Sequence, residues 1–207
     1  MASRIGNPKS MASLEIFVGG LKNKKIVYIP TAANGENGWG NWQRQGGSWE
    51  LINKVGADIK PVLLEEYRNK SVLQELENSD IILFAGGVAG YLMYWLKRCE
   101  IDKNIKRIIG DEKFLVGSSA GAMIFGQSLE VGEFYFTDEE IGAGKIEPLK
   151  LVDFDIYPHF EEKNLKDIKK LYTGKKLYLL KDGEQIIIDG DKMEVQGEER
   201  VVNGRIS

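Results

Sequence analysis

The sequence predicts an α/β fold in which a mostly parallel sheet is sandwiched by helices. Two observations carry this prediction. Short apolar runs alternate with helical patterns along the first two thirds of the chain, as in parallel sheets covered on both faces. In addition, the run Ile81–Phe84 is apolar without alternation, which is typical of a strand buried on both sides. Short strands separated by turns follow in the last third, so we expect a β-rich C-terminal part.

The expected elements follow in chain order. The predicted helices cover residues 11–21 with Ser10 as the N-cap, 48–55, 71–76 and 92–101. The predicted strands of the sheet are residues 25–29, 59–63, 81–84 and 113–116, and residues 108–110 end the crossover before the last of them. In the β-rich part, we expect a strand or hairpin at 130–136, extended chain at 151–157, and strands at 175–180, 185–188 and 192–195.

Composition limits the class of protein. The 207 residues fit one domain, residues 1–207, and a net charge of −3 gives no reason to expect nucleic acid as a partner. No apolar run is long enough to cross a membrane, and residues 1–11 lack the apolar core of a signal peptide. The one cysteine, Cys99, allows no internal disulfide. We therefore expect a cytoplasmic monomer or homodimer.

Residues 31–47 are predicted to form a long loop rich in glycine and asparagine. It carries Trp39 and Trp42. Because such a loop is long for a compact domain, we expect it to be functional or mobile and to overhang the strand ends. Either tryptophan could stack on a substrate, or both could fill the gap between the loop and the core.

The segment Gly117–Ala122 is the strongest signal for chemistry. It follows one apolar run, typical of a strand, and precedes another that can begin a helix. A strand that turns directly into a helix must bend sharply, and Gly117 and Gly121 frame Ser119 at the apex. Such an elbow would direct the Ser119 hydroxyl and the amide of Ala120 to one spot beside a helix N-terminus. A glycine-rich turn without chemistry is the alternative.

His159 is the only histidine in the chain, so it alone could serve Ser119 as an imidazole base. Pro158 precedes it and restricts the local backbone, so His159 is presented from a rigid, non-helical segment. The imidazole would accept the serine proton during attack, and a carboxylate would hold its tautomer. A surface or half-buried histidine without a catalytic role is the alternative.

Three features together resemble peptidase family S51, which includes dipeptidase E and the cyanophycinases. They are the elbow Gly117–Ala122, the triplet Pro158–Phe160, and the pair Gly86–Gly87 after a buried strand. The resemblance covers nearly the whole chain in element order. It implies a flavodoxin-like fold, similar to class I glutamine amidotransferases, with serine where those enzymes carry cysteine. It also implies a serine-type exopeptidase, such as a dipeptidase, that hydrolyses short peptides through an acyl-enzyme.

Site residues follow from the resemblance by position. Ser119 would be the nucleophile and His159 the base. Gly87 and Ala120 would supply the amides of the oxyanion hole. Val88 stands where the family commonly has an asparagine near the substrate, and we assign it, together with the tryptophans of residues 31–47, to substrate binding.

The acidic residue could come from two places. In the family it follows a strand in a Leu-Pro-Glu-Gly-like stretch, which Leu180–Gly183 matches, so the resemblance implies Asp182. An older family assignment puts the acid shortly after the serine, where this sequence offers Glu130 and Glu133. A hairpin turn without chemistry is the alternative for Asp182.

Departures from the family pattern bear on the substrate. The arginine with which dipeptidase E binds an N-terminal aspartate is not obvious downstream of His159. That region instead carries lysines typical of a solvated helix face, at positions 163, 166, 169 and 170. The first strand also looks shortened, since little precedes Ile5. An aspartyl preference is therefore not predicted.

Two other functions stay open. One is a binding or regulatory module that keeps the shell without turnover, which Val88 would suit. The other is an amidase or esterase acting on a non-peptide. Residues 86–90 lack the spacing of a dinucleotide site, and no cluster of cysteine and histidine could hold zinc, so we expect neither cofactor nor metal.

Overall fold

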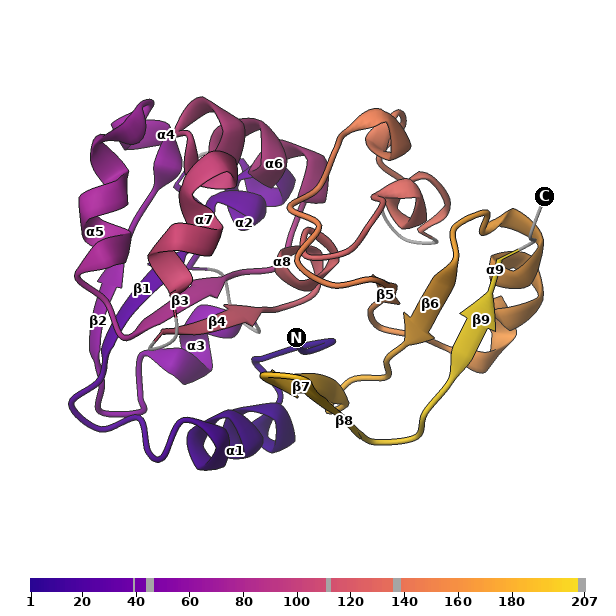
Figure 1. The fold of residues 1–207 in the computed structure, drawn as a ribbon, viewed down its shortest axis with the longest axis horizontal. Helices are drawn as coiled ribbons and strands as arrows, with labels where there is room; N and C mark the ends of the chain where they lie inside the picture. Colours follow the sequence, from indigo (N-terminus) through magenta and orange to yellow (C-terminus); the bar gives the residue numbers. More distant parts are fainter. Residues whose placement is uncertain (39, 44–46, 111–112, 136–138, 205–207) are drawn as a thin grey trace.

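The computed structural model describes residues 1–38, 40–43, 47–110, 113–135 and 139–204. Its centre is a parallel sheet with the strand order β2-β1-β3-β4 (Figure 1). These strands are β1 (Lys25–Ile29), β2 (Asp58–Pro61), β3 (Ile81–Phe84) and β4 (Phe114–Gly117). The predicted α/β fold with a mostly parallel sheet is confirmed.

Helices cover both faces of this sheet because alternate residues of its central strands point to opposite sides. Val27 and Phe84 join an apolar cluster on one face, whereas Tyr28 and Leu83 join the cluster on the other. The helices of the first face are α4 (Leu64–Tyr67), α5 (Leu73–Glu77), α6 (Ala89–Arg98), α7 (Ile101–Ile109) and α8 (Ala120–Met123). Those of the second face are α1 (Pro8–Phe17) and α3 (Ser48–Ile52).

Helix α1 begins earlier than predicted. Asn7, not Ser10, is the N-cap, and its side chain accepts a hydrogen bond of 2.9 Å from the amide of Lys9. Pro8 occupies the first helical position, where a missing amide hydrogen costs nothing. Ser10 is instead fully buried within the helix.

The prediction of an irregular loop over residues 31–47 is wrong for its first part. Residues Thr31–Asn37 form helix α2. Gly35 lies inside this helix, where a Cβ would come within 2.9 Å of the ring of Tyr91 on α6. The glycine therefore allows close packing of two helices rather than a turn. Trp39 lies outside the described residues.

The C-terminal part contains two small sheets. One has the order β5-β6-β9, with β5 parallel and β9 antiparallel to β6, and the other is the hairpin β7-β8. The strands are β5 (Asp155–Tyr157), β6 (Lys176–Leu179), β7 (Gln185–Asp189), β8 (Lys192–Gln196) and β9 (Val201–Asn203). The β-rich end is thus confirmed, although β9 was not predicted.

Several short helices lie in the connections between the longer elements. The predicted strand or hairpin at 130–136 is wrong, because residues Glu130–Phe134 form the 3₁₀ helix η2. The remaining helices are η1 (Lys70–Val72), which lies between α4 and α5, and η3 (Ala143–Lys145), η4 (Glu162–Asn164) and α9 (Leu165–Leu171), which lie between α8 and β6.

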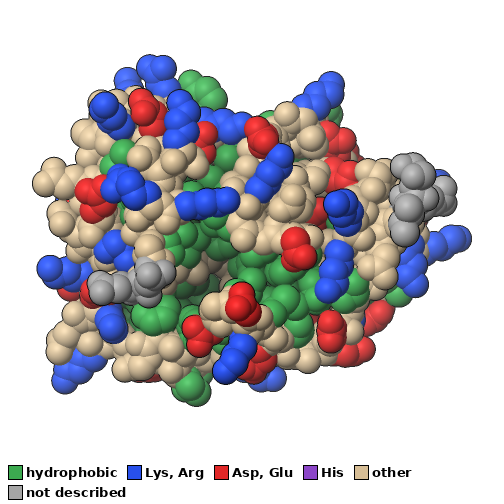
Figure 2. Space-filling view, viewed as in Figure 1, with side chains coloured by type: hydrophobic (Ala, Val, Ile, Leu, Met, Phe, Trp, Pro, Cys, Tyr) green, Lys and Arg blue, Asp and Glu red, His purple; other side chains and the backbone are tan. Residues whose placement is uncertain are grey.

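The start of the chain lies between the two halves of the molecule, beside β7 (Figure 1). Ala2 forms a parallel bridge to Ser118, directly after β4, and an antiparallel bridge to Gln185 on β7. The shortened first strand expected from the sequence is therefore a single bridging residue. In the view of Figure 2, apolar side chains gather in the hollowed middle of the molecule, where these parts meet.

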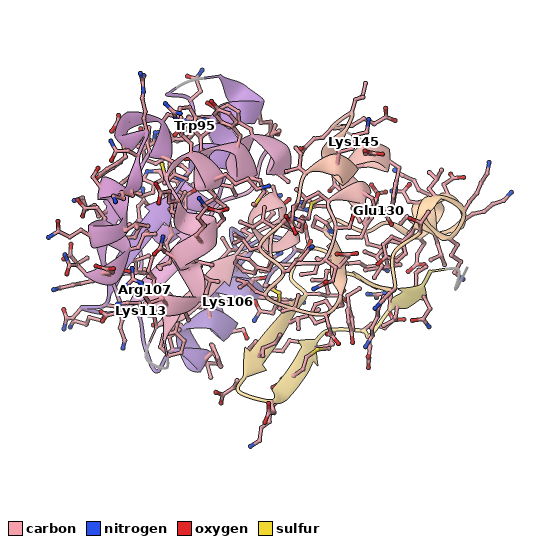
Figure 3. All side chains as sticks on the ribbon, turned by 45° about the horizontal axis from the view of Figure 1, so that its top comes forward. Trp95, Lys106, Arg107, Lys113, Glu130 and Lys145 are labelled. Carbon is pink, nitrogen blue, oxygen red and sulfur yellow. The ribbon has the colours of Figure 1, made fainter. Side chains whose placement is uncertain are left out.

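Charged contacts occupy the amino end of the central sheet. Arg107 and Lys113 lie close together there (Figure 3), and both bind Glu77, through its carboxylate and its carbonyl oxygen, at 2.8 Å each. Parallel α/β sheets bind their ligands at the opposite end, beyond the carboxyl ends of the strands.

Candidate active site

Ser119 lies at the turn from β4 into α8 and has a positive φ of +50° with ψ −118°. This backbone is strained for a non-glycine residue. A Cβ on Gly117 would come within 2.2 Å of the carbonyl oxygen of Gly121, and one on Gly121 within 2.3 Å of that of Phe84. Only glycines allow strand β4, helix α8 and strand β3 to approach this closely. The turn has the form of a nucleophile elbow.

His159 follows strand β5, and it too has a positive φ, +51°. Its neighbours hold this conformation. Pro158 restricts the preceding backbone, and Phe160 is buried in the core with its amide donating to the carbonyl of Leu180 at 3.0 Å.

Asp182 follows strand β6, the parallel neighbour of β5. Its turn is closed by a hydrogen bond of 2.9 Å from the amide of Glu184 to the carbonyl of Lys181. Gly183 adopts φ +91° within it, a conformation that glycine takes without strain. Because β5 and β6 run side by side in the same direction, the residues that follow them meet at one end.

Hydrogen bonds join these three side chains in a row. Nε2 of His159 lies 3.1 Å from Oγ of Ser119, and Nδ1 of His159 lies 2.5 Å from Oδ1 of Asp182. The hydrogen bond and charge of His159, aided by Ser3 and Arg4, lower the pKa of the Asp182 carboxyl. An ionised carboxylate, an imidazole and a hydroxyl in this order can transfer a proton from the serine.

The two glutamates weighed as alternative acids lie elsewhere. Glu130 accepts hydrogen bonds of 2.8 Å from the amides of Thr173 and Gly174, on the side of α9 (Figure 3). Glu133 accepts one of 2.9 Å from the amide of Gly144. These carboxylates bind backbone amides of other segments, whereas Asp182 is hydrogen-bonded to His159.

Gly87 and Ala120 border the same serine. Gly87 has φ +133°, and a Cβ there would come within 2.1 Å of the carbonyl oxygen of Ala32. Its neighbour Gly86 lies against Ser119, since a Cβ on Gly86 would be 3.1 Å from that of Ser119. Ala120 is the first residue of α8, and the first amides of a helix have no acceptor within it.

Ser119 and His159 line a cavity of about 1160 Å³. Val88 and Trp42 also line this cavity, and Trp42 is only 8% exposed. The Trp42 ring packs against those of Tyr28 and Trp49, with centroids 6.0 and 5.0 Å away. Trp42 therefore fills the space between loop and core while also lining the cavity.

Three residues at this site were missed by the sequence reasoning. Ser3 and Arg4 contact Asp182, at 3.2 and 3.6 Å. Glu140 accepts hydrogen bonds of 2.7 Å from the amides of Ala89 and Gly90, and so ties residues 139–146 to the start of α6 beside the cavity. No local sequence pattern identifies these residues, because each one contacts a partner that lies about 50 or more residues away in the sequence.

Within the described ranges, no group of three or more His, Cys, Asp or Glu side chains is placed to hold a metal ion. In the same part of the chain, no helix is both long and apolar enough to span a membrane.

Comparison with known families decides the relationship. Residues 6–196 match the model of peptidase family S51. The chain belongs to this family. Membership makes the protein a serine-type peptidase, a hydrolase, and agrees with the family expected from the elbow and the Pro-His-Phe triplet.

Relatives of similar length share about a quarter of their residues with this chain. The uncharacterized peptidase Lmo0363 of Listeria monocytogenes is 26% identical over 183 residues, which cover 86% of this chain and 88% of the relative. The uncharacterized peptidase PM1590 of Pasteurella multocida is 25% identical over 187 residues, with coverages of 87% and 89%.

Solved structures show the same fold. A crystal structure described as that of a peptidase E protein from Listeria monocytogenes superposes with a TM-score of 0.74 at 21% identity, covering 94% of this chain and 95% of that one. A peptidase from an acI-B1 actinobacterium gives a TM-score of 0.62 at 19% identity, covering 94% and 88%.

The elbow generates a prediction about stability. Gly117→Ala should lower the free energy of unfolding by about 3 kcal/mol, because its methyl group meets the backbone of Gly121, which cannot move away without shifting α8. Urea denaturation followed by circular dichroism measures the change. Gly6→Ala is the control, since a Cβ there meets nothing closer than 3.4 Å. Equal stability of the two variants would contradict the close packing of the elbow.

Proposed function

We propose that the protein is an exopeptidase that hydrolyses short peptides with Ser119 as nucleophile, His159 as general base and Asp182 as the acidic residue of the triad. The observation that carries this proposal is the row of hydrogen bonds from Asp182 through His159 to Ser119, at the apex of a strained elbow. Membership of peptidase family S51 supports the same chemistry.

In the proposed reaction, Nε2 of His159 takes the proton of the Ser119 hydroxyl while Oγ attacks the carbonyl carbon of the peptide bond. Asp182 holds the imidazole in the Nδ1–H tautomer and stabilises the imidazolium. The imidazolium then gives its proton to the leaving amine, and an acyl-enzyme on Ser119 remains. Water then attacks this ester, again with His159 as the base. This step releases the carboxylic acid product and restores the Ser119 hydroxyl.

The negative charge that develops on the carbonyl oxygen needs donors beside Ser119. We assign this role to the amides of Gly87 and Ala120. Gly87 follows strand β3, and its backbone packs against the backbone of Ala32 on α2. The Ala120 amide lies at the N-terminus of α8. Donors fixed in this way need no rearrangement during the reaction.

Short peptides fit the shape of the site. Ser119 opens into a cavity of about 1160 Å³, somewhat larger than the usual range for small-molecule sites, rather than onto an open sheet edge. Its lining includes Val88, Trp42 and several residues of the segment 139–146, which Glu140 ties to the start of α6. A substrate of a few residues, such as a dipeptide, would occupy this space. We extend substrate binding to Trp39 on the sequence alone.

An amidase or esterase acting on a non-peptide would use the same hydroxyl, imidazole and carboxylate, and a screen of substrates distinguishes it. A binding module without turnover is less consistent with the site, because a strained serine backbone has a cost that binding alone does not require. From the sequence alone, we further propose a cytoplasmic location and a monomeric or homodimeric state.

Replacing the nucleophile gives the first test of this function. Ser119→Ala should abolish hydrolysis in a screen of dipeptides and N-terminally blocked peptides, because no oxygen is left to form the acyl-enzyme, while the circular dichroism spectrum stays unchanged. Ser118→Ala is the matched control and should retain much of the turnover, because the Ser118 hydroxyl binds the amide of Ile5 and not the imidazole. Equal activity of Ser119→Ala and the wild type would rule out this mechanism, and cleavage of blocked peptides alone would rule out an exopeptidase that needs a free amine.

The acidic residue gives a second test. Asp182→Asn should reduce kcat by roughly 10⁴, because the amide permits the wrong imidazole tautomer. Thermal stability should change by no more than about 1 kcal/mol, as expected for a half-exposed side chain. Glu130→Gln and Glu133→Gln are the controls and should lose far less activity. If either glutamate variant lost as much activity as Asp182→Asn, the assignment of the acid would be wrong.

A further inference from the structure

Ser3 lies directly behind the proposed triad, on a part of the chain that the reaction itself does not use. Its side chain is completely buried, at 0% exposure. The Ser3 hydroxyl accepts a hydrogen bond of 2.8 Å from the backbone amide of His159 and donates one of 3.2 Å to Oδ1 of Asp182. The Ser3 hydroxyl thus links the main chain of His159 to the carboxylate of Asp182.

The carboxylate oxygen concerned is the one that meets the imidazole, since Oδ1 of Asp182 also lies 2.5 Å from Nδ1 of His159. Ser3, Asp182 and His159 therefore form a closed ring of hydrogen bonds. This ring fixes the direction from which the carboxylate approaches the imidazole. Arg4 lies 3.6 Å from the other carboxylate oxygen, but both of those side chains are 40% or more exposed, so this ion pair is weak.

The segment that carries Ser3 is also bound to the elbow. The amide of Ala2 donates to the carbonyl of Gly117 at 2.8 Å, and the amide of Ser119 donates to the carbonyl of Ala2 at 3.0 Å. The amide of Ile5 donates to Oγ of Ser118 at 3.0 Å. Residues 2–5 thus hold the elbow and the acidic turn in one register, although these lie more than 60 residues apart in sequence.

We infer that Ser3 is a positioning residue of the triad, which orients the Asp182 carboxylate toward the His159 imidazole. This inference rests on the proposed function. Ser3 does not reach the substrate and takes no proton in the reaction. The Asp182 side chain is 40% exposed, so its carboxylate could turn toward water or Arg4. The hydrogen bond from the Ser3 hydroxyl limits this rotation.

Ser3→Ala should leave KM nearly unchanged and lower kcat about tenfold to hundredfold, the size expected for losing one hydrogen bond to a charged group. Ser10→Ala is the matched control. Ser10 is also fully buried, and its hydroxyl has no hydrogen-bond partner in the described part of the chain, so this variant should keep the activity of the wild type.

A double-mutant cycle separates positioning from general support of the fold. If Ser3 acts through the carboxylate, Ser3→Ala should cost less than about threefold in kcat when Asp182→Asn is already present, because the partner it orients is gone. If Ser3→Ala costs the same factor in both backgrounds, or costs nothing in the wild type, the inference is wrong.

A second measurement does not depend on turnover. His159 is the only histidine, so untagged protein labelled with ¹⁵N-histidine contains one imidazole, and its NMR signals need no assignment. In the wild type we expect the Nδ1–H tautomer with a proton protected from water. In Ser3→Ala that proton should exchange at least about tenfold faster, because its acceptor is less firmly held. Unchanged exchange and tautomer would contradict the inference.

The two proposals fail in different ways. If the wild type and Ser119→Ala are equally inactive on every peptide tested, the proposed function fails, while the NMR comparison still reports whether Ser3 orients Asp182. If the wild type turns over and Ser3→Ala matches it in kcat and in the NMR signals, only the role of Ser3 is refuted.

Discussion

The active site depends on the close approach of backbones at the end of strand β4. Helix α8 begins one residue after Ser119, and two glycines, Gly117 and Gly121, allow the carbonyl oxygens of neighbouring segments to come within distances that any side chain would block. This packing holds Ser119 at φ +50°, where its hydroxyl reaches the imidazole of His159. The backbone strain is confined to this turn. The packing of the two apolar clusters, one on each face of the sheet, stabilises the fold enough to maintain the strained conformation.

The other members of the site are brought in by strand order. His159 and Asp182 each follow one of the two parallel strands β5 and β6, so they meet although 23 residues separate them. Residues 2–5 then join this pair to the elbow through main-chain hydrogen bonds and the hydroxyl of Ser3. Parts of the chain that are remote in sequence thus act as one rigid frame, which a reaction that depends on geometry within fractions of an ångström requires.

Much of this arrangement could be predicted from the sequence, for physical reasons. The elbow has a local signature, because only small residues fit there, and a single histidine left one candidate for the base. The contact of Asp182 with His159 agrees with the position implied by the family resemblance. Helix α2 was missed because Gly35, which packs against Tyr91, resembles a turn residue. Ser3 could not be found, since its partners lie more than 150 residues away.

The most direct measurement is peptide mapping by mass spectrometry after reaction of the native protein with a fluorophosphonate, which reacts rapidly only with an activated serine hydroxyl. A single adduct on Ser119 is the predicted result, and it should disappear when the protein is unfolded before the reaction, because the imidazole then no longer activates the hydroxyl. An adduct on Ser118 in place of Ser119, or no adduct on the native protein, would contradict the assignment of Ser119 as the nucleophile.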